Sequence, residues 1–91
     1  MSLNRYAKRR DKNESTIVEA LRKAGCDVHQ IDEPVDLIVG KSGRTVLMEV
    51  KGRGGKLTKN QCDFFALYRG EAYVVRTASA ALKIMEVDDE G

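Results

Sequence analysis

The sequence predicts an α/β fold in which helices flank a mixed four-stranded sheet. Three observations predict it. Apolar residues recur at helical spacing in three segments, short runs rich in valine, leucine and isoleucine lie between them, and glycine or proline residues punctuate the chain. The resulting αβββαβα order favours one sheet covered by helices, and 91 residues suffice for a single domain, spanning residues 1–91.

Three helices are expected. The first places Ile17, Leu21 and Ala24 along one side and ends at Gly25, a residue type common after helix ends. The second begins after Thr58, a good N-cap residue. The predicted helices cover residues 12–24, 59–69 and 79–86.

Four strands are expected between and after the first two helices. Pro34 separates the first strand from the second, and Ser42-Gly43 supplies a turn between the second and the third. A glycine-rich loop, residues 52–56, then leads to the second helix. The predicted strands cover residues 27–31, 36–40, 45–51 and 71–76.

The predicted hairpin brings two acidic residues together. With Ser42-Gly43 as a two-residue turn, Lys41 pairs with Arg44, and counting back along both strands puts Asp36 opposite Glu49. Lys51 then lies on the same face as Glu49, because strand side chains alternate. A one-residue slip in register would separate the two acids.

Facing carboxylates repel each other unless a cation lies between them. Oxygen ligands of this kind suit Mg²⁺ or Mn²⁺, and Lys51 could orient a water or offset charge that develops on a phosphate. An acid pair, a lysine and a metal suffice to hydrolyse a phosphodiester. The alternative is that Asp36 and Glu49 are exposed strand residues with Lys51 as their salt-bridge partner.

The charges are unevenly distributed although the net charge is only +2. Residues 1–12 and 51–59 each carry a net charge of +4, and residues 86–91 carry −4. Separated basic blocks suit a binder of the DNA backbone, although they are also compatible with solvated surface segments. We expect residues 1–10 to form a flexible basic arm and residues 87–91 a flexible acidic tail. The expected DNA contacts are Arg9, Arg10, Lys12, Arg53, Lys56 and Lys59.

Other features exclude several classes of protein. No apolar stretch is long enough to span a membrane, and the absence of an export signal favours the cytoplasm. Cys26, Cys62 and the single His29 do not make a zinc site, and both cysteines are expected to be reduced and buried. The glycine-rich loop lacks the P-loop pattern and is expected to be a flexible basic loop beside the site. The aromatic residues look too scattered for a base-stacking platform.

The segment from Glu33 to Asp36, followed by a hairpin and Glu49-Val50-Lys51, resembles the PD-(D/E)XK nuclease superfamily. Within it the chain looks like the VRR-NUC family of virus-type replication-repair nucleases, and the likeness runs from about Arg10 to Met85. It includes Asn13-Glu14 and the run from 56 to 61. Val35 departs from the pattern by separating the proline from the aspartate. The resemblance implies a restriction-endonuclease-like core.

The resemblance also implies roles for individual residues. Asp36, Glu49 and the backbone carbonyl of Val50 would bind Mg²⁺ or Mn²⁺, and Lys51 would be the catalytic lysine. Glu14 would contact the metal or a water, and Gln61 would support the lysine or the water. Spacing alone offers another reading, in which Glu14 and Gln61 belong to capping boxes with Asp11 and Thr58.

The implied activity is metal-dependent, structure-selective cleavage of DNA. Branched DNA is favoured, with a homodimer acting on Holliday junctions as the leading possibility, and the implied setting is a phage or prophage protein in the host cytosol. Flap cleavage and non-specific DNA cleavage remain open. The competing class is a non-catalytic nucleic-acid-binding module that keeps the nuclease fold.

Overall fold

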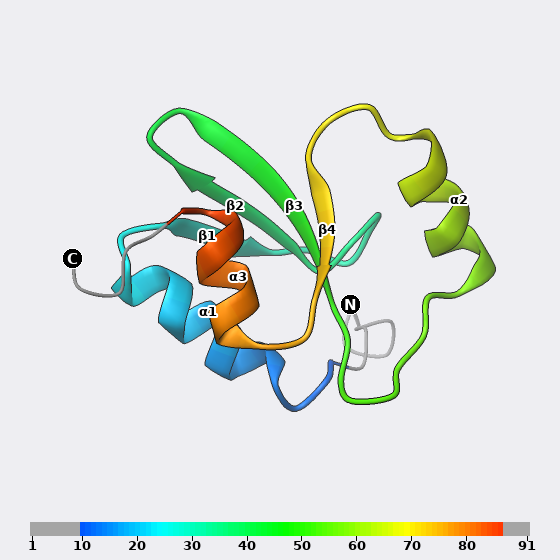
Figure 1. The fold of residues 1–91 in the computed structure, drawn as a ribbon, viewed down its shortest axis with the longest axis horizontal. Helices are drawn as coiled ribbons and strands as arrows, with labels where there is room; N and C mark the ends of the chain where they lie inside the picture. Colours follow the sequence, from blue (N-terminus) through cyan, green and yellow to red (C-terminus); the bar gives the residue numbers. More distant parts are fainter. Residues whose placement is uncertain (1–9, 87–91) are drawn as a thin grey trace, which may run out of the picture.

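The four strands form one mixed sheet with the strand order β1-β2-β3-β4. The computed structural model describes residues 10–86 and confirms the α/β fold and the predicted element order (Figure 1). The pairs β1–β2 and β2–β3 are antiparallel, and β3–β4 is parallel, with α2 in the connection between them. The elements are α1 (Glu14–Lys23), β1 (Asp27–Gln30), β2 (Leu37–Lys41), β3 (Arg44–Val50), α2 (Lys59–Leu67), β4 (Ala72–Val75) and α3 (Ala78–Ile84).

The β2–β3 hairpin has the predicted register. Lys41 pairs with Arg44, and the ladder continues to the pair of Leu37 with Met48. The two turn residues between the strands, Ser42 and Gly43, both have positive φ angles, 54° and 81°. Two successive residues with positive φ match the tight turn whose twist fits a hairpin. The turn therefore fixes the register on which the geometry of the acidic residues depends.

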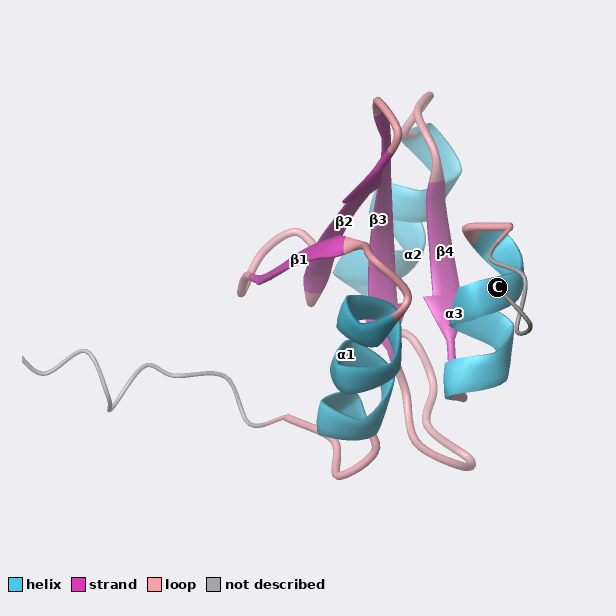
Figure 2. Ribbon diagram, turned by 90° about the vertical axis from the view of Figure 1, so that its left-hand side faces the viewer, coloured by secondary structure: helices cyan, strands magenta, loops and turns pink. Residues whose placement is uncertain are grey.

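The hydrophobic core lies between the sheet and two helices. α1 and α3 lie together on one side of the sheet, and α2 lies on the other (Figures 1 and 2). The core is built from alternate strand residues and from the apolar stripe of α1, as the sequence pattern indicates. Its fully buried members include Ile17, Leu21, Leu37, Val39, Val46, Met48 and Ala81. By contrast, α2 buries none of its residues.

Arg44, at the start of β3, links the sheet to the segment before β4 and to the end of α3. Arg44 Nε and Nη2 donate to the two carboxylate oxygens of Glu71 at 2.8 and 2.6 Å, and Nη1 donates to the carbonyl of Ile84 at 2.8 Å. These hydrogen bonds hold the pKa of the Glu71 carboxyl below its usual value. The pair lies beside the hairpin turn, at the opposite end of β3 from Glu49.

Some local predictions were wrong. The first helix starts at Glu14 rather than Lys12, and its N-cap is Asn13, which makes no side-chain capping hydrogen bond. Asp11 therefore forms no capping box, and only its backbone carbonyl accepts from the amide of Glu14. Both cysteines are free, but Cys62 is exposed because α2 has no buried face. Cys26 is buried, and burial raises the pKa of its thiol.

The predictions about a membrane span and about the two ends of the chain can be compared with the structure only over residues 10–86. Within residues 10–86, no helix has the length and apolarity needed to cross a membrane. The acidic tail at 87–91 and the arm up to Arg9 lie outside the described residues. Arg10 is described, and it is held in place by several side-chain contacts rather than being part of a flexible arm.

Candidate active site

Three carboxylates are the buried charged side chains of residues 10–86. Glu14, Asp36 and Glu49 are only 2%, 4% and 2% exposed. Burying a charge is unfavourable unless it is paired or hydrogen-bonded, so each of these carboxylates requires specific partners. They come from the start of α1, the residue before β2 and the end of β3. The family resemblance assigns Asp36 and Glu49 to a metal site and Glu14 to a contact with the metal or a water.

Asp36 is fixed against the end of β3. Its Oδ2 accepts a hydrogen bond of 2.8 Å from the backbone N–H of Val50, and its backbone carbonyl accepts one from Ile31. The β2–β3 register, extended by one pair, places Asp36 opposite Glu49 as predicted. The Asp36 side chain thus accepts from a β3 backbone amide just beyond the first backbone pair of β2 with β3, Leu37 with Met48. A hydrogen bond to a backbone amide stabilises the ionised carboxylate.

Glu49 lies between the lysine and the glutamine that the sequence indicated. Lys51 Nζ is 3.3 Å from Glu49 Oε2, and Gln61 Nε2 donates to the same oxygen at 2.9 Å. Lys51 follows β3 and reaches back along the face that it shares with Glu49. The shared face of Glu49 and Lys51 follows from the predicted register, whereas the contact of Gln61 with Glu49 was not predicted.

Gln61 forms the capping box that the spacing predicts and also reaches a carboxylate of the candidate site. Its backbone N–H donates to Thr58 Oγ1, and its Oε1 accepts from the backbone N–H of Thr58, which completes a capping box. The remaining amide group, Nε2, is then free to donate to Glu49. A primary amide has one acceptor and two donors, so a single side chain serves the helix and the site together.

Glu14 is held by two donors on one oxygen. Arg10 Nη1 and Gln30 Nε2 each donate to Glu14 Oε2 at 2.7 Å. Within the part of the chain that the structure describes, the buried Glu14 Oε1 has no hydrogen-bond partner. Arg10 Nη1 also lies 3.7 Å from Asp36 Oδ1, so its guanidinium links the two carboxylates.

Two cationic side chains lie beside the buried carboxylates. Arg10 contacts Glu14 and Asp36, and Lys51 contacts Glu49. Asp32, which Arg10 also contacts, is 61% exposed and is screened by solvent.

The donor set fits a hard divalent cation. Mg²⁺ commonly uses one or two carboxylates and keeps several waters, so Asp36, Glu49 and the carbonyl of Val50 suffice. Among residues 10–86, no group of three or more acidic, histidine or cysteine side chains is arranged to hold a metal ion. Glu14 is engaged by Arg10 and Gln30, which sets it apart from the other two carboxylates.

Sequence reasoning missed two residues that position the site. Asn13 Nδ2 donates to the backbone carbonyls of Lys51 and Arg76, at 3.1 and 2.9 Å. Arg76 in turn donates to the carbonyls of Gly52 and Gly55, at 2.7 and 2.9 Å. The glycine-rich loop is therefore anchored rather than flexible. Asn13 was visible only as part of the family-like run at the first helix, and no sequence signal marked Arg76.

Of the six residues predicted to contact DNA, four are exposed on the surface of the described structure. Those on the surface are Lys12, Arg53, Lys56 and Lys59, and Lys59 forms an exposed ion pair with Asp63 at 3.2 Å. Arg10 lies within the carboxylate cluster instead, and Arg9 lies outside the described residues. A cleft of about 330 Å³ borders the site, and its lining includes Asp32, Pro34, Gln61 and Phe64.

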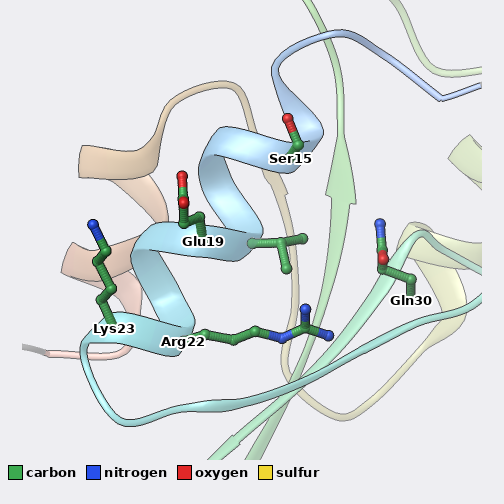
Figure 3. A pocket seen from close by; sticks show the side chains of 6 residues that line it. Ser15, Glu19, Arg22, Lys23 and Gln30 are labelled. Atoms are coloured by element: carbon green, nitrogen blue, oxygen red, sulfur yellow. The ribbon is translucent and has the colours of Figure 1, made fainter.

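A larger hollow, of about 720 Å³, lies beside α1 (Figure 3). It is lined by Ser15, Val18, Glu19, Arg22, Lys23 and Gln30. Gln30 connects it to the site through its bond to Glu14, but none of the predicted catalytic residues lines it. Its charges are mixed, and Arg22 is already used to hold the carbonyl of Val28.

In comparisons with known proteins, no family model, no curated protein and no solved structure matches the chain.

Proposed function

We propose that this protein is a metal-dependent DNA endonuclease of the VRR-NUC type within the PD-(D/E)XK superfamily. One observation carries the proposal. The buried carboxylates Glu14, Asp36 and Glu49 gather where β2 and β3 meet α1, with Lys51 and Gln61 bonded to Glu49. Buried charge is unfavourable for stability, and three buried carboxylates close to Arg10 and Lys51 favour a catalytic role over a structural one.

The residues divide the work between them. Asp36, Glu49 and the Val50 carbonyl would hold Mg²⁺ or Mn²⁺, which when bound supplies Lewis-acid stabilisation of a phosphate and lowers the pKa of a bound water. Lys51 brings a positive charge to the side of Glu49, where it can offset negative charge that develops on the phosphate. Gln61 keeps the Glu49 carboxylate in one orientation.

The surface around the site supports DNA as the substrate. Lys12, Arg53, Lys56 and Lys59 are exposed and belong to segments on either side of the carboxylates. Contacts of this kind bind the phosphate backbone without reading sequence, so DNA shape must select the substrate. Branched DNA is therefore the favoured substrate, with a Holliday junction cut by a homodimer as the leading form.

A non-catalytic nucleic-acid-binding module is the second candidate. The observation that favours it is the guanidinium of Arg10, which already neutralises part of the charge on Glu14 and Asp36. In that case the cluster would be a buried ion network, and no divalent cation would be needed.

A cleavage assay separates the two candidates. Labelled four-way junction, flap and linear duplex are incubated with the protein in Mg²⁺, in Mn²⁺ and in EDTA. We expect metal-dependent cleavage, faster on branched DNA, and a loss of about 100-fold or more in rate for Lys51→Ala. Lys41→Ala is the matched control, because Lys41 is a half-buried strand lysine at the other end of the hairpin. DNA binding without cleavage in either metal would support the binding module and contradict the proposal.

A further inference from the structure

The outward side of α2 carries an exposed apolar groove. It has a volume of about 450 Å³ and is lined by Asn60, Asp63, Phe64, Leu67 and Tyr68. Leu67 and Tyr68 are 78% and 44% exposed, and they are two of the three large apolar side chains that residues 10–86 leave exposed. Exposed apolar groups gathered at one place mark a binding surface more often than isolated ones do.

Two aromatic rings in this groove are stacked on each other. Phe64 and Tyr68 lie one helical turn apart, with ring centroids separated by 4.9 Å and ring planes inclined by 25°. The aromatic residues look too scattered along the sequence for a base-stacking platform, but a spacing of four residues brings these two onto one face of the helix. The stack offers a flat π surface next to solvent.

Gly70 lies close to the Tyr68 ring. A Cβ atom at residue 70 would lie only 2.7 Å from Tyr68 Cε2 and Oη, so a larger residue there would shift the ring from the position seen in the structure.

The groove is continuous with the cleft at the candidate active site. Asn60 and Phe64 line both hollows, and the cleft is also lined by Gln61, which donates to Glu49. The charge of the surrounding segment also suits a nucleic acid. Residues 56–69 contain Lys56, Lys59 and Arg69 against the single acid Asp63, a net charge of +2.

We propose that this groove binds an unpaired nucleobase of the DNA substrate. The base would stack against the Phe64–Tyr68 pair and Leu67, while Asn60 and Asp63 offer hydrogen bonds to its polar edge. An apolar pocket with a few polar groups at its rim has the composition of a small-ligand site, and its volume lies in the usual range of roughly 300–1,000 Å³. The proposal rests on the proposed DNA cleavage. Among branched substrates it favours flaps and splayed arms, which have unpaired bases beside the cleaved bond, over the fully paired Holliday junction.

The test measures binding in EDTA, so that it does not depend on cleavage. Fluorescence anisotropy compares a duplex that carries a five-nucleotide single-stranded flap with a blunt duplex of the same length. We expect the wild-type protein to prefer the flap, and Tyr68→Ala to weaken flap binding about tenfold, the typical effect of losing one stacked base. Tyr68→Phe should bind like the wild type, and Tyr68→Leu, which keeps an apolar side chain but no ring, should bind like Tyr68→Ala. Tyr73→Ala is the matched control, because Tyr73 is 38% exposed and does not line the groove.

Several outcomes would overturn this inference. Equal loss of flap and blunt-duplex binding in Tyr68→Ala would do so, as would unchanged binding in Tyr68→Leu. Light scattering supplies a further outcome: if Tyr68→Ala converts a dimer into a monomer, the groove is occupied by a second copy of the chain. If the protein cleaves DNA in a metal-dependent way but does not prefer the flap, only the proposed role of the groove is rejected. If it binds the flap but cleaves no DNA, the proposed nuclease function is rejected.

Discussion

Single residues in this protein serve two purposes where the site meets the fold. In the capping box of α2, the backbone N–H of Gln61 donates to Thr58 and its side-chain Oε1 accepts from the Thr58 N–H. Its Nε2 donates to Glu49. Asn13 precedes α1 and spends its side-chain amide on the carbonyls of Lys51 and Arg76 rather than on a cap. Polar side chains at the starts of these two helices therefore contact the candidate site, Gln61 in addition to its capping bonds and Asn13 in place of one.

Arg10 provides the prediction at the scale of one residue. Its guanidinium neutralises Glu14 and Asp36, so Arg10→Met should lower the free energy of unfolding in EDTA by about 2 kcal/mol, the usual effect of losing hydrogen bonds to a charged group. The greater negative charge should also strengthen cation binding. Mn²⁺ should therefore raise the melting temperature of Arg10→Met more than that of the wild type.

Thermal unfolding with and without Mn²⁺ makes this measurement. Arg22→Met is the control, because Arg22 also donates from its guanidinium to a backbone carbonyl but contacts no carboxylate in the described structure. An equal Mn²⁺-induced rise in the wild type and in Arg10→Met would contradict the assignment of the carboxylates to a cation site.

Sequence reasoning could place Asp36 and Glu49 because their relation is local. The turn at Ser42-Gly43 fixes the register, and the register brings the two acids to opposite positions. It could not foresee the contacts of Arg10 with Asp36 or of Arg76 with the glycine-rich loop, which join residues more than 20 positions apart. Such contacts depend on how whole elements pack, and no local pattern encodes them.

At the scale of elements, α2 differs from the other two helices. α1 and α3 bury apolar residues against the sheet, whereas α2 buries none and contacts the site through Gln61. The sequence predicted the position of this helix from its N-cap, but its lack of a strong apolar stripe was not recognised as a sign of exposure. The same misreading explains the wrong prediction for Cys62.

Two substitutions in the capping box of α2 distinguish an effect on helix stability from an effect on cleavage. Thr58→Ala removes the cap but leaves the contact of Gln61 with Glu49 possible, so it should destabilise α2 by about 1 kcal/mol and preserve most of the cleavage rate. Gln61→Ala loses both contacts and should slow cleavage by about 10- to 100-fold, as the loss of a residue that supports a metal ligand typically does. Amide hydrogen exchange in α2 and cleavage rates measure the two effects.

Thr77→Ala is the matched control for loss of a cap, because the Thr77 hydroxyl also accepts from the backbone N–H three residues further on, at the start of a different helix, α3. If Thr58→Ala slowed cleavage as much as Gln61→Ala, the role of Gln61 would be limited to the helix, and its support of Glu49 would be refuted.

At the scale of the whole molecule, the arrangement of layers explains the location of the site. α1 and α3 lie on one side of the sheet (Figures 1 and 2). The buried acids come from the start of α1, the residue before β2 and the end of β3, at one end of the two central strands. The opposite end of the sheet is closed by the Arg44–Glu71 pair. One end of the domain is thereby stabilised by an arginine–glutamate pair, while the other end holds the three buried carboxylates.

The most direct test of the central claim is to locate a metal ion. Anomalous diffraction from crystals soaked in Mn²⁺ should show a peak in contact with the carboxylates of Asp36 and Glu49, and Glu49→Gln should abolish it. A peak that persists unchanged in Glu49→Gln, or the absence of any peak at these two residues, would contradict the assignment of this cluster as a metal-dependent active site.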